Sequence, residues 1–224
     1  MIPLEDAQAL VVDRCGALGP VEVPFEEAVG LVLAADVVAE ELVPPFDNTA
    51  VDGYAVIAAD TASVPVDLEV VGEVAAGAFT DRVLVRGEAI RIMTGAPIPV
   101  GADAIVMVED TERLVDGSVE RVRIATSVEA GAAVRRAGDD VRPGQLLFEA
   151  GTLVTPPIVG VLASINARTV PVHRRVRVAV LSTGDELVED GRPLRPGEIR
   201  ESNRRMLSGL LRSAGCDVVD MGTV

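Results

Sequence analysis

Four short segments of the chain carry side chains that could bind an oxyanion or a metal ion. Each combines carboxylates or hydroxyls with Gly, Pro or Asn, which favour turns, and binding residues concentrate on loops. Carboxylate oxygens suit hard cations such as Mg²⁺, whereas hydroxyls and backbone N–H groups suit anions. The four segments are 44–55, 90–99, 138–141 and 182–187.

The first segment, PPFDNTAVDGYA at 44–55, begins with two prolines that exclude a helix. Asp52-Gly53 is a strong hairpin-turn signal, and the only Tyr of the chain, Tyr54, follows it. A polar turn without a function explains these residues. The alternative is a functional loop, because a rare aromatic residue lies here beside acidic side chains.

The next two segments also have a plain and a functional interpretation. In IRIMTGAPIP at 90–99, a strand runs into a turn held by two prolines. This is either a stiff loop or a place where the Thr94 hydroxyl and nearby N–H groups meet an oxyanion. Asp139 and Asp140 form either a solvated turn or a pair of oxygen ligands for a cation such as Mg²⁺.

The fourth segment, STGDEL at 182–187, follows an apolar run that predicts a buried parallel strand. Open α/β sheets bind ligands just past the carboxyl ends of such strands. Hydroxyls and Gly backbone could cradle a phosphate or oxyanion here, and two carboxylates could hold a metal or activate water. These candidates are Ser182, Thr183, Gly184, Asp185 and Glu186.

Composition limits the kind of ligand. The net charge is −15, and all 20 basic residues are Arg. Because a nucleic-acid-binding protein needs a basic face, no nucleic acid partner is expected. An anionic substrate must therefore be held by local Arg, by backbone N–H groups or through a metal ion. Hydrophobic residues make up 49% of the chain and aromatics only 2%, so the core must consist of Val, Leu, Ile and Ala, which favours strands.

The remaining single residues predict no further chemistry. Cys15 and Cys216 form no CxxC or zinc pattern, and two reduced thiols in a cytoplasmic protein are expected. We expect no signal peptide and no membrane span, since no apolar run approaches about 20 residues. His173, the only His, stands beside Arg174 and Arg175 and is expected at the surface rather than in catalysis.

Three helices are expected in the parts of the chain that flank a β-rich region. The first covers 3–18 and has an apolar stripe. The second covers 25–33, although Gly30 weakens it by about 1 kcal/mol relative to Ala. The third covers 156–165, with Thr155 as its N-cap, and is expected to pack against the first two.

From 44 to about 137, short apolar runs alternate with Gly, Pro and Asp, which predicts a compact β domain with hairpins. Examples of predicted strands are 68–74, 104–108 and 119–124. Since the helix at 156–165 is expected to pack against the N-terminal helices, this β domain is expected to be an insertion.

The last part of the chain predicts a βαβ unit. The run 176–181 predicts a strand buried on both faces, a helix follows Ser202 or Asn203 as its cap, and another strand begins at 218. The predicted buried stripe of the helix is Met206, Leu207, Leu210, Leu211 and Ala214. A parallel sheet needs more than two strands, so we expect that this domain is incomplete and that the chain is truncated at Val224.

Five segments together resemble the molybdenum insertase family, which comprises molybdopterin molybdenumtransferases and is related to the E domain of gephyrin. The resemblance covers essentially the whole chain, in order. The matching segments are PPFDNTAVDGYA at 44–55, IRIMTGAPIP at 90–99, AGDDV at 137–141, VLSTGDEL at 180–187 and GEIRESN at 197–203.

The resemblance implies a multidomain α/β fold. It consists of an elongated helical/β linking domain, an inserted β domain and an incomplete, molybdopterin-binding-like domain with a parallel sheet. The expected ranges are 1–43 with 138–172, then 44–137, and 173–224. The implied reaction places molybdenum from molybdate into adenylylated molybdopterin and releases AMP with the help of Mg²⁺. Pyrophosphate cleavage of this kind needs a metal on phosphate oxygens and an oriented water.

The resemblance also implies site residues and partners. Asp52, Thr94, Asp140 and Glu186 are expected to be catalytic, and Ser182, Thr183 and Gly184 to bind substrate. The implied metal ligands are Asp185, Glu186 and Asp140. A homodimer with a site shared between subunits is implied, with molybdopterin adenylyltransferase as a pathway partner. Because family members continue past Val224, the chain alone is expected to be inactive.

Two other functions remain as alternatives. A non-catalytic scaffold or partner-binding module would keep the same architecture, but the acidic residues at 52, 140 and 186 favour an enzyme. A generic sugar- or nucleotide-phosphate enzyme would predict a P-loop or GxGxxG motif, and the sequence contains neither.

Overall fold

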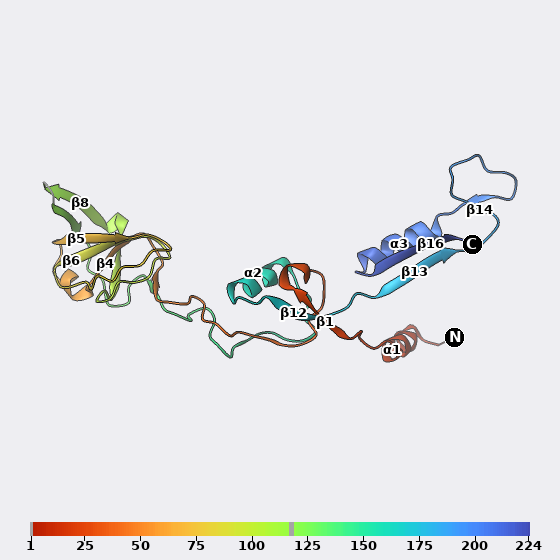
Figure 1. The fold of residues 1–224 in the computed structure, drawn as a ribbon, viewed down its shortest axis with the longest axis horizontal. Coiled ribbons are helices and arrows are strands. Elements are labelled where there is room, and N and C mark those ends of the chain that lie inside the picture. The colour runs from red at the N-terminus through yellow and green to blue at the C-terminus, as the bar shows by residue number, and fades with distance from the viewer. Residues whose placement is uncertain (1, 117–118) are drawn as a thin grey trace. The chain divides into compact units, whose positions relative to one another are not determined.

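The computed structural model describes residues 2–116 and 119–224 and is a mixed α/β protein that divides into two units (Figure 1). Unit 1 comprises Met1–Val38 and Leu146–Val224, and unit 2 comprises Ala39–Gln145. Unit 2 is therefore an insertion in the chain order of unit 1. The predicted ranges 1–43 and 44–137 include three residues, 1, 117 and 118, that lie outside the described part. The division into three domains stays a prediction.

Unit 2 contains a six-stranded sheet in the order β7-β4-β6-β5-β9-β8. Its strands are β4 (Gly53–Val56), β5 (Val66–Val74), β6 (Glu88–Ile92), β7 (Ala104–Met107), β8 (Thr111–Asp116) and β9 (Val119–Ile124). All neighbouring pairs are antiparallel except β5 with β6, which is parallel. The strands predicted at 68–74, 104–108 and 119–124 are confirmed as β5, β7 and β9.

Both faces of the sheet carry apolar clusters around β4, β6 and β7, because residues of these strands enter two separate clusters. On the central strand β4, Tyr54 and Val56 join one cluster and Ala55 joins the other. The clusters consist mainly of Val, Ile, Leu and Ala, as the low aromatic content requires. Two short 3-10 helices, η2 (Ala58–Thr61) and η3 (Val108–Asp110), follow β4 and β7.

Short strand pairs complete the rest of unit 2 and the first part of unit 1. In unit 2, β3 (Asn48–Thr49) pairs with β10 (Val134–Arg135). In unit 1, β1 (Pro20–Pro24) pairs with β12 (Thr169–His173), and β2 (Val37–Val38) pairs with β11 (Leu146–Phe148), all antiparallel. Buried Leu33, Leu162 and Val172 form part of the core in this part of unit 1.

The predicted helices differ in outcome. Helix α1 (Leu4–Arg14) is shorter than the predicted 3–18, and none of its residues is buried. The predicted helix at 25–33 is wrong, because only the 3-10 helix η1 (Phe25–Glu27) forms. Gly30 has a φ of +77°, which ends helical structure, and Val32 and Leu33 form β-bridges to Leu153 and Val172 instead.

Helix α2 (Pro156–Ser164) confirms the third predicted helix and contacts η1. Thr155 occupies its N-cap position, but its side chain makes no capping hydrogen bond. Across residues 2–116 and 119–224, no helix combines the length and the apolar character needed to cross a bilayer.

The predicted βαβ unit is confirmed. Strands β13 (Arg177–Ser182) and β16 (Asp217–Thr223) are parallel, and α3 (Asn203–Ser213) connects them and contacts both. A second parallel pair, β14 (Leu187–Val188) and β15 (Ile199–Arg200), lies between β13 and α3 in the chain.

The predicted burial in this region is wrong in two respects. The predicted apolar stripe of α3 is largely exposed, with Met206, Leu207 and Leu210 each more than two-fifths exposed. The helix instead buries Arg204 and Ser208, which are four residues apart and share one face. Strand β13 is not buried on both faces either, since only Val180 is buried. Within the described residues, β13 has a single neighbouring strand, which leaves most of its surface uncovered.

Candidate functional site

The pairing of β4 with β6 brings two of the predicted site residues together. Asp52 directly precedes β4 and Thr94 follows β6. The two strands are antiparallel with Gly53 opposite Ile92, so the start of one lies beside the end of the other. The backbone N–H and the hydroxyl of Thr94 both donate to Oδ1 of Asp52, each at 2.7 Å.

This hydrogen-bond pattern stabilises the ionised form of Asp52. The backbone N–H of Thr94, then its hydroxyl, and finally the charge of Arg91 lower the pKa of the Asp52 carboxyl below its usual value. Both Asp52 and Thr94 are exposed. Oδ2 of Asp52 has no hydrogen-bond partner in the described part of the chain. The pair therefore presents a solvent-facing carboxylate oxygen beside an oriented Thr side chain.

The start of the first segment is tied to the third segment by a charge pair. Asp47 accepts hydrogen bonds from Arg136 Nη1 at 2.6 Å and from the Ala137 N–H at 2.8 Å. The Ala137 N–H, followed by Arg136, lowers the pKa of Asp47. Sequence reasoning missed this link, although the opposite charges of Asp47 in the first segment and Arg136 just before the third were a signal for it.

Asp140 lies in the same unit, held by other contacts. Its Oδ2 accepts a hydrogen bond from Arg135 Nη2 at 2.5 Å, and its N–H donates to the Val43 carbonyl. Neighbouring Asp139 accepts the Arg136 N–H at 2.6 Å. Among the described residues, no hydrogen bond joins Asp140 to Asp52.

In unit 1, the STGDEL loop has a conformation that requires its glycine. Gly184 has a φ of +147°, and a Cβ there would lie 2.5–2.8 Å from the Glu186 carboxylate. The glycine thus lets the Glu186 side chain fold back over the loop. Among the described residues, no side-chain hydrogen bond is made by Thr183, Asp185 or Glu186, and all three are exposed. Their polar atoms are therefore available to a ligand.

The carboxylate of Glu201 anchors the start of the STGDEL loop. Its Oε1 accepts hydrogen bonds from the Ser182 hydroxyl at 3.1 Å and from the Arg204 N–H at 2.7 Å. Ser202 occupies the N-cap position of α3, one of the two predicted, but its side chain makes no capping hydrogen bond. Glu201 is buried and serves instead, because its carboxylate reaches the first turn of the helix.

The guanidinium of Arg204, a buried residue whose backbone N–H donates to Glu201, makes the next set of contacts near this loop. It contacts the carboxylates of Glu189 and Asp220, and Thr223 also donates to Glu189. These contacts explain why α3 turns a charged residue toward the sheet, since a buried charge needs partners. These contacts connect α3 with β16 and with the segment after β14. They lie near the end of β13, where the predicted ligand loop begins.

The predicted site residues thus belong to two units. Asp52, Thr94 and Asp140 lie in unit 2, and the residues from Ser182 to Glu186 lie in unit 1. Over residues 2–116 and 119–224, no group of three or more His, Cys, Asp or Glu side chains is close enough to share a metal ion. The convergence of Asp52, Asp140 and Glu186 stays a prediction.

Comparison with known proteins identifies the family. Residues 2–166 match the family model described as the MoeA N-terminal region, domain I and II.

The chain belongs to the MoeA family.

The predicted resemblance to this family is thereby confirmed, and the relatives described below match 90–100% of the chain. Molybdopterin molybdenumtransferase 2 of Mycobacterium tuberculosis is 44% identical over 227 residues, which is 100% of this chain and 55% of that relative. Molybdopterin molybdenumtransferase of Bacillus subtilis is 37% identical over 90% of this chain and 48% of its own length. The MoeA family chain therefore spans about half the length of these curated relatives.

A solved structure gives the same family assignment. The crystal structure of the molybdopterin biosynthesis moeA protein from Pyrococcus horikoshii OT3 matches with a TM-score of 0.89 and 34% sequence identity. The match covers 100% of the MoeA family chain and 60% of the Pyrococcus chain.

Proposed function

We propose that this chain belongs to a molybdopterin molybdenumtransferase and takes part in molybdenum cofactor biosynthesis. The proposed reaction transfers molybdenum from molybdate into adenylylated molybdopterin and releases AMP. The observation that carries the proposal is the Asp52–Thr94 pair, which two motif segments form in a chain 44% identical to a protein named for this transfer.

Asp52 acts in this proposal as an ionised carboxylate. Its lowered pKa keeps it negatively charged in neutral solution, and its unpartnered Oδ2 can accept a proton or a hydrogen bond from water. Thr94 holds the carboxylate in one orientation through two hydrogen bonds. The pair can therefore orient a water molecule toward the phosphate that leaves as AMP.

The residues present fit Mg²⁺ by their donor chemistry. Mg²⁺ prefers oxygen ligands and is commonly held by one or two carboxylates together with substrate phosphates and water. Exposed Asp185 and Glu186 offer such oxygens, and Asp140 shares its carboxylate with Arg135. When bound by Asp140, Asp185 and Glu186, Mg²⁺ would neutralise charge on the phosphate oxygens.

The STGDEL loop is assigned to substrate oxyanions. Because the Ser182 hydroxyl donates its proton to Glu201, Ser182 fixes the start of the loop and offers a lone pair rather than a donor. Thr183 and the backbone around Gly184 are then the groups left to meet a phosphate or molybdate oxygen. Hydrogen bonds to charged oxygens are stronger than neutral ones, so a few such donors contribute substantially.

The proposal includes assembly and partners. A homodimer would allow the acidic residues of one subunit's unit 2 to meet the STGDEL loop of another subunit. Molybdopterin adenylyltransferase would supply the adenylylated substrate. Since the chain spans about half the length of its curated relatives, we infer that the 224-residue chain alone does not insert molybdenum. AMP release and cofactor formation by the purified chain would refute this inference.

Equilibrium binding tests the proposed role of the acidic residues. Adenylylated molybdopterin is titrated into the 224-residue chain with and without Mg²⁺. Glu186→Ala is expected to abolish the Mg²⁺-dependent part of the affinity, whereas Glu149→Ala, an exposed residue of the same unit outside the loop, leaves it intact. Asp52→Asn is compared in the same way with exposed Asp81→Asn. Mg²⁺-dependent binding that survives Glu186→Ala would favour a scaffold function.

A further inference from the structure

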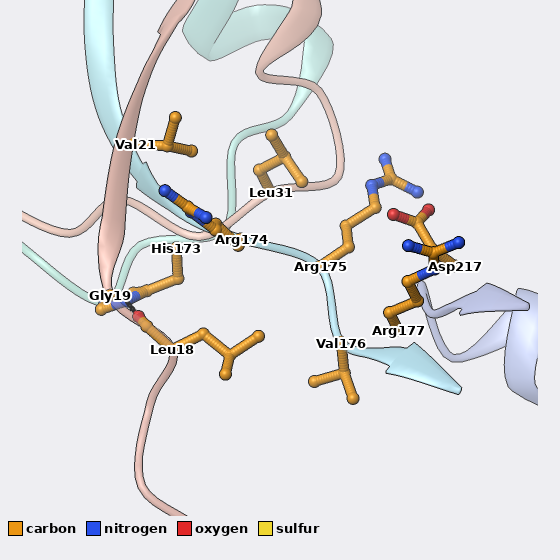
Figure 2. A pocket seen from close by; sticks show the side chains of 10 residues that line it. All are labelled: Leu18, Gly19, Val21, Leu31, His173, Arg174, Arg175, Val176, Arg177 and Asp217. Atoms are coloured by element: carbon orange, nitrogen blue, oxygen red, sulfur yellow. Dashed lines mark hydrogen bonds between the residues drawn. The ribbon is translucent and has the colours of Figure 1, made fainter. Parts of the chain in front are cut away.

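A cavity of about 850 Å³ in unit 1 gathers basic side chains in a chain whose net charge is −15. Arg174, Arg175 and Arg177 line it together with His173, as Figure 2 shows. Asp217 is the one carboxylate in the lining. None of the residues assigned to molybdenum transfer lines this cavity, so it is a separate feature of the molecule.

The connection between two strands places these arginines at the cavity. His173 ends β12 and Arg177 begins β13, so Arg174 and Arg175 lie in the short connection between them. His173 is held in place because its Nδ1 lies 2.8 Å from the Leu18 carbonyl, to which it donates. The preceding β12 is paired with β1. The basic segment therefore directly follows a strand that is paired in a sheet.

The residues that line the cavity carry more positive than negative charge. Asp217 is the register partner of Arg177, and its N–H donates to the Val176 carbonyl at 2.9 Å. Figure 2 shows its carboxylate near both Arg175 and Arg177. Arg175 makes one long hydrogen bond, 3.5 Å, to the Val29 carbonyl. In the described part of the chain, no ion pair within 4.0 Å involves any of the three arginines of the lining. With three guanidinium groups and one carboxylate, the lining therefore carries an excess of two positive charges.

Apolar side chains form the rest of the cavity wall. They are Leu18, Val21, Leu31 and Val176. In Figure 2, Arg174 lies on the side of Val21, and Arg175 lies on the side of Asp217. A ligand in this cavity would therefore contact both guanidinium groups and an apolar surface. The volume is within the usual range of about 300–1,000 Å³ for small-molecule sites.

We propose that this cavity binds a small organic phosphate. The excess of two positive charges matches the double negative charge of a phosphate monoester, and the planar fork of Arg fits phosphate oxygens. In Figure 2 the side chains of Arg174 and Arg175 extend in different directions from the connection, and because both are long and exposed, either can turn toward a bound phosphate. The apolar wall then covers the organic part of the ligand, which inorganic phosphate lacks.

The test is calorimetric titration of the 224-residue chain with phenyl phosphate at low ionic strength. We expect saturable binding that Arg174→Ser/Arg175→Ser weakens by at least about tenfold, because charge-assisted hydrogen bonds are the strong ones. Arg195→Ser/Arg212→Ser is the matched control, since it removes the same charge at exposed positions outside the cavity. Equal losses in both double variants, or no binding by the parent chain, would overturn the proposal.

Two further arms separate the contributions to binding. Asp217→Asn removes the opposing carboxylate and should tighten phenyl phosphate binding several-fold; unchanged or weaker binding would contradict the assigned charge balance. Inorganic phosphate and molybdate should bind at least several-fold more weakly than phenyl phosphate, because they cannot use the apolar wall. Equal affinity for all three would show a site for a free oxyanion and would refute the organic ligand. Far-UV circular dichroism confirms that each variant is folded.

Discussion

The hydroxyl of Ser182 and the first turn of helix α3 are joined through Glu201, whose Oε1 accepts a hydrogen bond from Ser182 at 3.1 Å. The same oxygen accepts the Arg204 N–H at 2.7 Å. One buried carboxylate thus couples the STGDEL loop to the helix that follows it. Its other oxygen, Oε2, has no partner among the described residues.

Glu201→Ala is expected to destabilise unit 1 by about 1–3 kcal/mol, because it leaves buried donors unsatisfied and removes the helix cap. Glu201→Gln keeps an acceptor oxygen at the same place and should restore most of this loss. Urea unfolding of the three proteins measures the free energies. Ser202→Ala is the control and should change stability little, since Ser202 makes no side-chain capping bond. A larger loss for Ser202→Ala than for Glu201→Ala would contradict the observed cap.

Thr94→Val is expected to raise the pKa of Asp52 while leaving it below its usual value. The hydroxyl donor is lost, but the Thr94 backbone N–H, the largest cause of the lowered pKa, remains. A lowered folded-state pKa contributes stability above the unfolded-state pKa, and this contribution disappears as the pH falls through the folded-state value. The variant should therefore lose it at a higher pH. Carbon-13 NMR titration of the Asp52 carboxyl measures the shift, and Thr80→Val should produce none.

Gly53→Ala is expected to destabilise unit 2 by at least about 1–3 kcal/mol. A Cβ at this position would lie 2.0 Å from the Val106 carbonyl oxygen, so β4 and β7 would have to separate. Gly72→Ala is a matched control on β5, where a Cβ would meet nothing within 4 Å. Chemical denaturation compares the two variants. Similar stabilities for both would show that β4 and β7 approach less closely than described.

Glu198 should titrate far below the range of an ordinary Glu. Hydrogen bonds from Arg192, followed by the Arg195 N–H, lower its pKa from 4.5 to about 2. Since this pKa is depressed, the contribution of Glu198 is complete above pH 4.5 and is lost as the pH falls toward 2. The Arg195 amide shift in NMR spectra should report a midpoint near the lower value, and Glu198→Gln should remove the transition. A midpoint near pH 4.5 would exclude the Arg192–Glu198 pair in solution.

Local patterns in the sequence were sufficient for several elements. The run 176–181, the helix after 202 and the strand from 218 predicted the parallel pair β13–β16 with α3 between them, and the structure has this unit. Turn residues around 52–53 and 94–95 marked both segments that form the Asp52–Thr94 pair. These predictions succeeded because turn chemistry and strand periodicity depend on neighbouring residues.

The same kind of reasoning failed where distant contacts override a local pattern. An apolar stripe at helical spacing predicted that α3 buries Met206 and Leu210, yet the helix directs Arg204 toward Glu189 and Asp220. The expected helix at 25–33 gave way to bridges with residues more than 100 positions away in the chain.

The sequence by itself determined the family, the motif segments and several of the strands, because each of these depends on short runs of residues. Only the tertiary structure decided that Thr94 directs two donors at Asp52 and that Glu201, rather than Ser202, caps α3. It also decided that three arginines line one cavity beside His173 with a single carboxylate. Such relationships depend on strand register and on which charges find partners across the fold, and these are set by contacts between residues far apart in the chain.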